Sequence, residues 1–256
     1  MATGSPDAAD PKRGEREYFA RIGEEGRRHA LAKPFGDALC AQYLANLTAL
    51  LELMPVPPAR VVEFGCGTGW LGQLLAMRGY SVIGIDISPD AIELAKASAA
   101  LRGVAVEYRV ADYEDAVPEG TNDVVIFHDA LHHAESEAAA LQSAHAALRP
   151  GGLAICIEPG EGHSQSESSR RAVTEFGVHE KDMPPPTILR HARDAGFRRS
   201  LVLPLPTALV RSTYRRDNLE QATAGRRWQL RLMTLYRTLR LQFRGRRQGM
   251  VILWKD

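Results

Sequence analysis

Apolar and polar positions along the middle of the chain alternate between two periods. Five short apolar runs have the length expected of buried strands: residues 60–64, 81–85, 104–110, 123–127 and 153–157. Three segments between them have the spacing and the end signals of helices: residues 69–78, 88–101 and 135–148. Strands that alternate with helices predict parallel crossover units. We therefore expect an α/β fold with one doubly wound, Rossmann-like sheet.

Further elements are predicted on both sides of this core. Helices are expected over residues 18–28 and 37–53, followed by a proline-rich stop. After the core come a helix over residues 185–194 and strands over residues 197–205 and 250–254, the last of them antiparallel. A helix over residues 219–243 separates those two strands.

The domain boundaries follow from these elements. Residues 1–16 are polar and small, which predicts a disordered N-terminus. Residues 17–256 are expected to form a single domain, with a helical lid over residues 17–54 and a helical insertion over residues 206–248.

The first strand of the core leads into a glycine-rich turn. Glu63 ends the strand, and Gly65, Gly67 and Gly69 follow at alternate positions before a helix. Glycines let the backbone approach a ligand closely. The dinucleotide fingerprint needs a glycine where this chain has Trp70. The carboxylate of Glu63 would repel a pyrophosphate but would suit an amino group, which argues against an NAD-dependent oxidoreductase.

Acidic residues also end the next two strands. Asp86, followed by Ile87, lies about twenty residues beyond the glycine turn, where a carboxylate can accept hydrogen bonds from ribose hydroxyls. Asp112 and Tyr113 follow the third strand. The carboxyl ends of parallel strands meet at one edge of a sheet, so these residues are expected to line one crevice.

In this order, these segments resemble the class I S-adenosylmethionine-dependent methyltransferases. The resemblance covers residues 60–158, including the Leu-Arg-Pro-Gly-Gly turn before the fifth strand. It implies that the loop over residues 63–69 holds the methionyl end of S-adenosylmethionine and that Asp86 holds the ribose. It implies that Asp112 and Tyr113 contact the adenine.

A histidine-rich loop follows the fourth strand. In the resembling family this loop commonly faces the methyl group, so His128, His132 and His133 are candidate bases. We favour His132 or His133 as the base, with His128 nearer the cofactor. A metal ion held by these histidines and Asp129 is the weaker alternative, and the expected site is metal-free.

The loop after the fifth strand supplies the candidate substrate-binding residues Glu158, Glu161 and His163. Segments over residues 21–35 and 176–184 could cover them as lids. The arrangement is similar to uncharacterised bacterial methyltransferases of small molecules or sugars. The expected acceptor is therefore a hydroxyl of a sugar or natural-product intermediate. N- or C-methylation, and a non-catalytic cofactor-binding subunit, remain alternatives.

Charge is distributed unevenly although the net charge is only +1. Residues 211–256 hold twelve Lys or Arg against three Asp or Glu, and the rest of the chain holds 20 against 28. These arginines could meet phosphates, but we favour the solvated face of a helix packed on the domain or on a second subunit. A homodimer through this insertion is one possibility. Aromatic residues are not interleaved as a nucleic-acid platform requires, so nucleic acid is not an expected partner.

The three cysteines are widely spaced and form no Cys-x-x-Cys pair. They predict buried thiols in a reducing compartment. No segment has the apolar length of a membrane span or a signal peptide. A cytoplasmic protein is expected.

Overall fold

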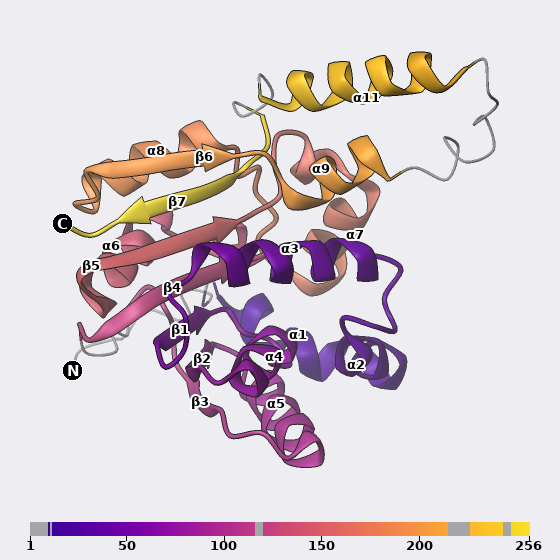
Figure 1. Cartoon of the computed structure of the whole chain (residues 1–256). Helices are drawn as coiled ribbons and strands as arrows, with labels where there is room; N and C mark the ends of the chain where they lie inside the picture. Colours follow the sequence, from indigo (N-terminus) through magenta and orange to yellow (C-terminus); the bar gives the residue numbers. More distant parts are fainter. Residues whose placement is uncertain (1–9, 11, 116–119, 215–225, 243–246) are drawn as a thin grey trace, which may run out of the picture.

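The computed structural model describes residues 10, 12–115, 120–214, 226–242 and 247–256. Its centre is a seven-stranded sheet in the order β3-β2-β1-β4-β5-β7-β6 (Figure 1). The strands are β1 Arg60–Phe64, β2 Ser81–Asp86, β3 Glu107–Val110, β4 Asn122–His128, β5 Leu148–Ile157, β6 Arg199–Leu203 and β7 Met250–Trp254.

The sheet is parallel except at its last strand. β1 pairs in parallel with β2 and β4, and β4 pairs in parallel with β5. β7 runs antiparallel to both β5 and β6. The predicted Rossmann-like sheet with a final antiparallel strand is confirmed. Because β1 to β5 run in one direction, their carboxyl ends share one edge.

Helices cover both faces of the sheet (Figure 1). They are α1 Arg13–Arg21, α2 Gly23–Ala32, α3 Cys40–Leu53, α4 Trp70–Arg78, α5 Pro89–Arg102, α6 Glu137–Ala147, α7 Glu167–Phe176, α8 Pro185–Asp194, α9 Pro206–Thr213 and α11 Arg227–Gln242. One core cluster joins α3 and α4 to one face, with Leu50, Leu71 and Leu75 fully buried. The other joins α6 and α8 through Leu141 and Ile188. Burial on both faces explains why β1 and β4 are continuous apolar runs.

The N-terminal boundary differs from the prediction. Residues 1–9 and 11 lie outside the described residues, but α1 begins at Arg13, inside the segment expected to be disordered. Lys12 lies within 2.8 Å of the carboxylates of Asp112 and Glu114, on the core of the domain. These long-range ion pairs hold a segment whose composition alone indicates disorder.

The C-terminal insertion contains α9 and α11. The predicted helix over residues 219–243 corresponds to α11, and residues 215–225 and 243–246 lie outside the described part of the chain. Short 3-10 turns at Leu131–His133 and His163–Gln165, and helix α7, were not predicted. Among the cysteines, Cys66 and Cys156 are buried as expected, whereas Cys40 is half-buried; all three are free.

Candidate active site

Two adjoining cavities lie at the carboxyl ends of the strands. The larger has a volume of about 870 Å³ and the smaller about 140 Å³. Four residues line both of them: Glu15, Gly65, Asp129 and His133. The pocket therefore forms where a doubly wound sheet binds ligands.

The glycine turn forms part of both cavity walls. Gly65 and Gly67 adopt φ angles of 71° and 51°, which favour glycine. A Cβ at Gly67 would contact nothing nearer than the ring of Phe19, 3.6 Å away, so this position faces open space. Gly69 was predicted to contact the cofactor, but it lines neither cavity. The ring of Tyr108 fills the space beside its Cα. Gly69 instead begins α4 in the left-handed conformation.

Glu63 lies at the end of β1 in the wall of the larger cavity. Its side chain is buried, and Oε2 has no hydrogen-bond partner among the described residues. Burial raises the pKa of this carboxyl to about 8, although the backbone N–H of Gly72 opposes the shift. Oε2 lies beside Gly72 of α4, so Glu63 presents a buried carboxyl group in the cavity wall with this oxygen on the side of the helix.

Asp86 lies at the end of β2 in the wall of the smaller cavity, next to Ile87. Its Oδ2 accepts from the backbone N–H of Gly67 at 2.8 Å, and its Oδ1 accepts from that of Ser88 at 2.9 Å. Burial raises its pKa. These bonds fix the carboxylate and tie the tip of β2 to the glycine turn, while each oxygen keeps a further acceptor site.

Asp112 and Tyr113 line the same cavity on its far side. Asp112 Oδ2 accepts from Lys12 Nζ at 2.6 Å, and Oδ1 accepts from the backbone N–H of Glu114. The Tyr113 hydroxyl donates to the carbonyl of Ala130 at 2.9 Å, and its ring is buried. Lys12 thus holds the carboxylate that the resemblance assigns to adenine.

His128, at the end of β4, is held on both sides of its ring. Its Nε2 accepts from Asn46 Nδ2 at 3.0 Å, and its Nδ1 lies 3.3 Å from Asp129 Oδ2. The rings of Tyr43 and Trp70 pack against it. With both nitrogens occupied, His128 lines the pocket but is a poor candidate for the base.

His132 forms a buried pair with Glu158. The Glu158 carboxylate accepts from the backbone N–H groups of Ala130, Leu131 and His132, and lies 2.7 Å from His132 Nδ1. Glu158 is therefore a positioning residue with its oxygens engaged, and not a free contact for the acceptor. Burial lowers the pKa of His132 to about 3, so the ring is neutral. An Nδ1–H that donates to Glu158 leaves the Nε2 lone pair free.

His133 is the charged neighbour of His132. Burial lowers its pKa, but the nearby carboxylate of Glu15, 3.5 Å from Nδ1, outweighs this and raises it to about 9. Glu15 Oε1 also accepts from the backbone N–H of His179 at 2.7 Å. A protonated His133 cannot accept a proton, so His132 and His133 differ in role despite their adjacency.

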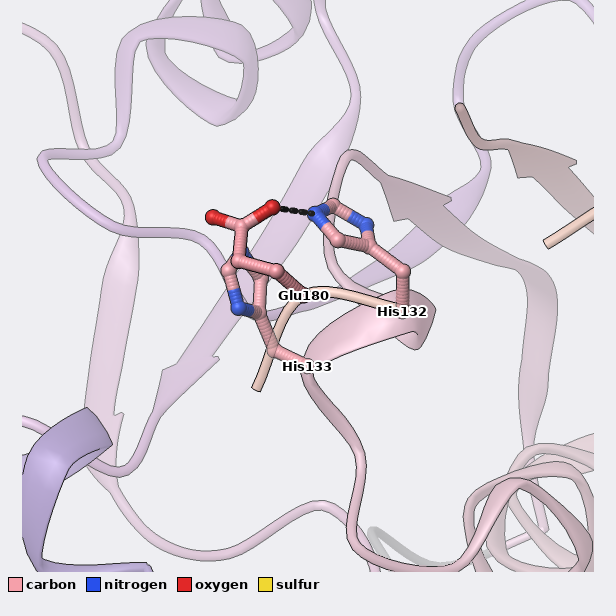
Figure 2. A group of neighbouring side chains, drawn as sticks. All are labelled: His132, His133 and Glu180. Carbon is pink, nitrogen blue, oxygen red and sulfur yellow. Dashed lines mark ion pairs between the residues drawn. The ribbon is translucent and has the colours of Figure 1, made fainter. Parts of the chain in front are cut away.

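Figure 2 shows Glu180 reaching toward both histidines. Its Oε2 lies 2.5 Å from His163 Nε2 and 3.9 Å from His132 Nε2. His132, His133 and Glu180 offer ligand atoms within 4.8 Å of one another and so could hold a metal ion. This group differs from the one considered in the sequence, because Glu180 takes the place of His128 and Asp129.

Glu161 lies at the rim of the larger cavity. Its carboxylate is exposed and lies 3.2 Å from Arg247 Nε. It can therefore meet an acceptor only at the pocket entrance, whereas His163 lies deeper in the wall.

The sequence does not mark several residues of this site, Lys12, Glu15 and Glu180 among them. Lys12 and Glu15 stand in the segment expected to be disordered, and Glu180 was only part of a possible lid. Each meets its partners through folding alone: Glu15 contacts His133 and His179 across more than a hundred residues. No local pattern marks such pairs, although the sequence His-Glu-Lys-Asp at residues 179–182 is an unusually charged stretch for a lid.

Comparison with known proteins gives a partial match. Residues 62–156 match a family model described as a methyltransferase domain. A ubiquinone biosynthesis O-methyltransferase from Methylobacterium sp. (strain 4-46) is 39% identical over 100 residues, covering 39% of this chain and 40% of that protein. The corresponding protein of Xanthomonas campestris pv. campestris (strain B100) is 34% identical over 131 residues, covering 48% and 55%. The chain thus spans about half the length of the curated relatives it matches.

Solved structures match over most of the chain. Phosphoethanolamine N-methyltransferase 2 from Haemonchus contortus, in complex with S-adenosyl-L-methionine, aligns with a TM-score of 0.64 at 19% identity over 94% of this chain and 60% of that one. Geranyl diphosphate C-methyltransferase from Streptomyces coelicolor A3(2) aligns with a TM-score of 0.62 at 15% identity over 97% and 99%. At these identities the likeness establishes the fold.

Proposed function

We propose that this chain, which carries a class I S-adenosylmethionine-dependent methyltransferase domain, transfers a methyl group to a hydroxyl of a small polar acceptor. The observation that carries this proposal is the Glu158–His132 pair in the pocket wall. A neutral imidazole with one nitrogen bound to a carboxylate is the arrangement that takes a proton from a hydroxyl.

The residues of the pocket fit the cofactor. The carboxyl group of Glu63 suits the ammonium of its methionyl end, and Gly67 in the same cavity wall leaves open space. Asp86, next to Ile87, suits the ribose hydroxyls, and the cavity wall at Asp112 and Tyr113 suits the adenine. When bound, S-adenosylmethionine supplies an electrophilic methyl group.

His132 then accepts the proton of the acceptor hydroxyl, and its neighbours hold the ring in position. His132 Nε2 takes the hydroxyl proton, while the Nδ1–H stays on the ring and keeps its hydrogen bond to Glu158, whose carboxylate stabilises the imidazolium. His128, locked by Asn46, positions the wall beside the glycine turn.

The polar lining of the larger cavity supports this acceptor class. His163 and Thr207 line the pocket, and Glu161 stands at its rim. These groups suit a hydroxylated ring such as a sugar or natural-product intermediate. The free thiols suit the reducing cytoplasm as its location.

The test is transfer of a labelled methyl group from S-adenosylmethionine to a panel of phenols, sugar nucleotides and amines. We expect labelled product from hydroxyl acceptors, reduced by roughly 10² to 10⁴-fold in His132→Asn. His145→Asn, on α6 away from the pocket, serves as the matched control and should keep full activity.

Transfer to amines that is unaffected by His132→Asn would replace this proposal with N-methylation. Cofactor binding without turnover on any acceptor would favour the non-catalytic subunit instead.

A further inference from the structure

Helix α11 carries an apolar face that the rest of the described chain does not cover. Five side chains at helical spacing are each between 54% and 64% exposed: Trp228, Leu232, Leu235, Tyr236 and Leu239. Their spacing of four, three, one and three residues places them on one side of the helix. Scattered apolar residues are common on surfaces, but a continuous stripe of this kind marks a binding surface.

The opposite side of α11 packs on α9. Thr238 Oγ1 lies 3.1 Å from Ser212 Oγ, and the two helices lie side by side (Figure 1). α9 in turn contributes Thr207, Ala208 and Arg211 to the wall of the larger cavity. The apolar stripe therefore points away from the domain, one helix beyond the pocket.

The charges on α11 restrict what can cover this stripe. Helical geometry places Arg231 and Arg240 on its two sides, and both are exposed. The sequence of α11 contains no Asp or Glu. Pairing with the same stripe of a second copy would bring these arginines together without a carboxylate of either helix between them. An anionic surface is the complementary partner.

We propose that α11 binds the surface of an anionic lipid bilayer. An apolar stripe with Trp and Tyr enters the boundary between head groups and acyl chains, while flanking arginines meet lipid phosphates. No helix in the described residues is long and apolar enough to cross a membrane. α11 therefore lies in the plane of the interface and holds the α9 wall of the pocket next to the bilayer.

Vesicle sedimentation of the full chain tests this surface. We expect binding to vesicles of phosphatidylcholine with phosphatidylglycerol that exceeds binding to phosphatidylcholine alone by about tenfold or more. The triple variant Leu232→Gln, Leu235→Gln and Leu239→Gln should lose binding by at least about tenfold. Arg231→Gln with Arg240→Gln should abolish the preference for the anionic lipid.

Matched controls distinguish binding through this surface from nonspecific hydrophobic binding and from the effects of unfolding. Met77→Gln with Leu101→Gln removes two exposed apolar residues on α4 and α5 and should bind vesicles as the wild type does. The melting temperature and the affinity for S-adenosylhomocysteine should be unchanged in every variant.

Absence of binding to the anionic vesicles overturns the proposal. So does a wild-type dimer in light scattering that the triple variant converts to a monomer while vesicle binding stays the same in both. That second outcome would assign the stripe to a second copy of the chain, as the homodimer considered from the sequence requires.

Discussion

The buried carboxyl group of Glu63 links the free energy of unfolding to cofactor binding. Burial holds the pKa of this carboxyl near 8, above its usual 4.5, so the folded protein favours the protonated form. Its contribution to stability is complete below about pH 4.5 and is lost as the pH rises through about 8. Because the ionised Glu63 destabilises the folded protein, we explain its presence by a role in binding the cofactor.

We predict that Glu63→Gln stabilises the protein and impairs binding. Measured without cofactor, the variant should gain stability over wild type as the pH rises from 5 to 9, by a few kcal/mol at about 1.4 kcal/mol per pKa unit. Its affinity for S-adenosylmethionine should fall at least about tenfold. Chemical denaturation and calorimetry measure the two effects. Glu93→Gln, an exposed neighbour on α5, is the control; equal behaviour of the two variants would contradict the account.

The pH profile of kcat distinguishes His132 from an ordinary histidine. Burial places its pKa near 3, so it stays neutral as the pH falls from 8 to 5. We predict that kcat is nearly flat over this range. A tenfold loss per pH unit below about pH 6.5 would instead indicate an exposed, unperturbed histidine as the base.

Metal removal should leave the reaction unchanged. His133, with its pKa near 9, places a proton between the carboxylates of Glu15 and Glu180, where a metal ion would otherwise supply the positive charge. We predict equal kcat before and after dialysis against EDTA. Loss of activity that is restored by a divalent cation would establish the His132, His133 and Glu180 group as a metal site.

Among individual site residues, the sequence identifies those that lie next to the end of a strand and few others. Glu63, Asp86 and Asp112 reach the cavities because each ends, or directly follows, a parallel strand. Gly69 was assigned to the cofactor by spacing, yet Tyr108 occupies its free side. The hydrogen bonding of His132 depends on Glu158, and its pKa is lowered further by the protonated His133. Sequence spacing does not reveal either contact.

Among the elements, α1 changes the site most. It places Glu15 and Phe19 on the pocket, and Lys12, just before it, binds both Asp112 and Glu114. Burial lowers the pKa of Lys12, but these carboxylates outweigh it and raise the pKa. α1 thus acts as a cover over the smaller cavity, held by the Lys12 ammonium group and by the contacts of Glu15 with His133 and His179.

We predict that Lys12→Met loosens this cover. Dissociation of S-adenosylhomocysteine, followed by stopped flow, should accelerate roughly tenfold, which corresponds to about 1.4 kcal/mol. Arg13→Met removes an exposed charge one residue along and should have no effect. Slower dissociation in Lys12→Met would mean that Lys12 competes with the cofactor for Asp112 and does not enclose it.

The core elements follow from sequence periodicity, whereas the cover does not. β1, β4 and β7 are apolar runs whose burial on two faces leaves a clear pattern. α1 and α7 are polar helices in which only Gly14 and Ser169 are fully buried, and hydrogen bonds from Arg21 to the carbonyls of Glu175 and Phe176 join them. Among the elements that enclose the site, α2 and α3 fall within the lid predicted over residues 17–54, whereas α7 and the start of α1 were missed.

For the whole molecule, the doubly wound sheet fixes where ligands bind, and the acidic body and basic C-terminal region divide the surface by charge. The pocket lies at the carboxyl edge between α1, α3 and the segment after α7. The exposed stripe of α11 lies one helix away. S-adenosylmethionine is expected to bind where Asp86 and the glycine turn meet.

The most direct test is calorimetric titration with S-adenosylmethionine, S-adenosylhomocysteine and NAD. Both adenosyl compounds should bind the wild type and NAD should not. Asp86→Ala and Asp86→Asn should weaken binding by about tenfold or more, and Asp194→Ala, at the exposed end of α8, should not. Folded protein that binds neither adenosyl compound, or that binds them equally well without the Asp86 carboxylate, would contradict the account.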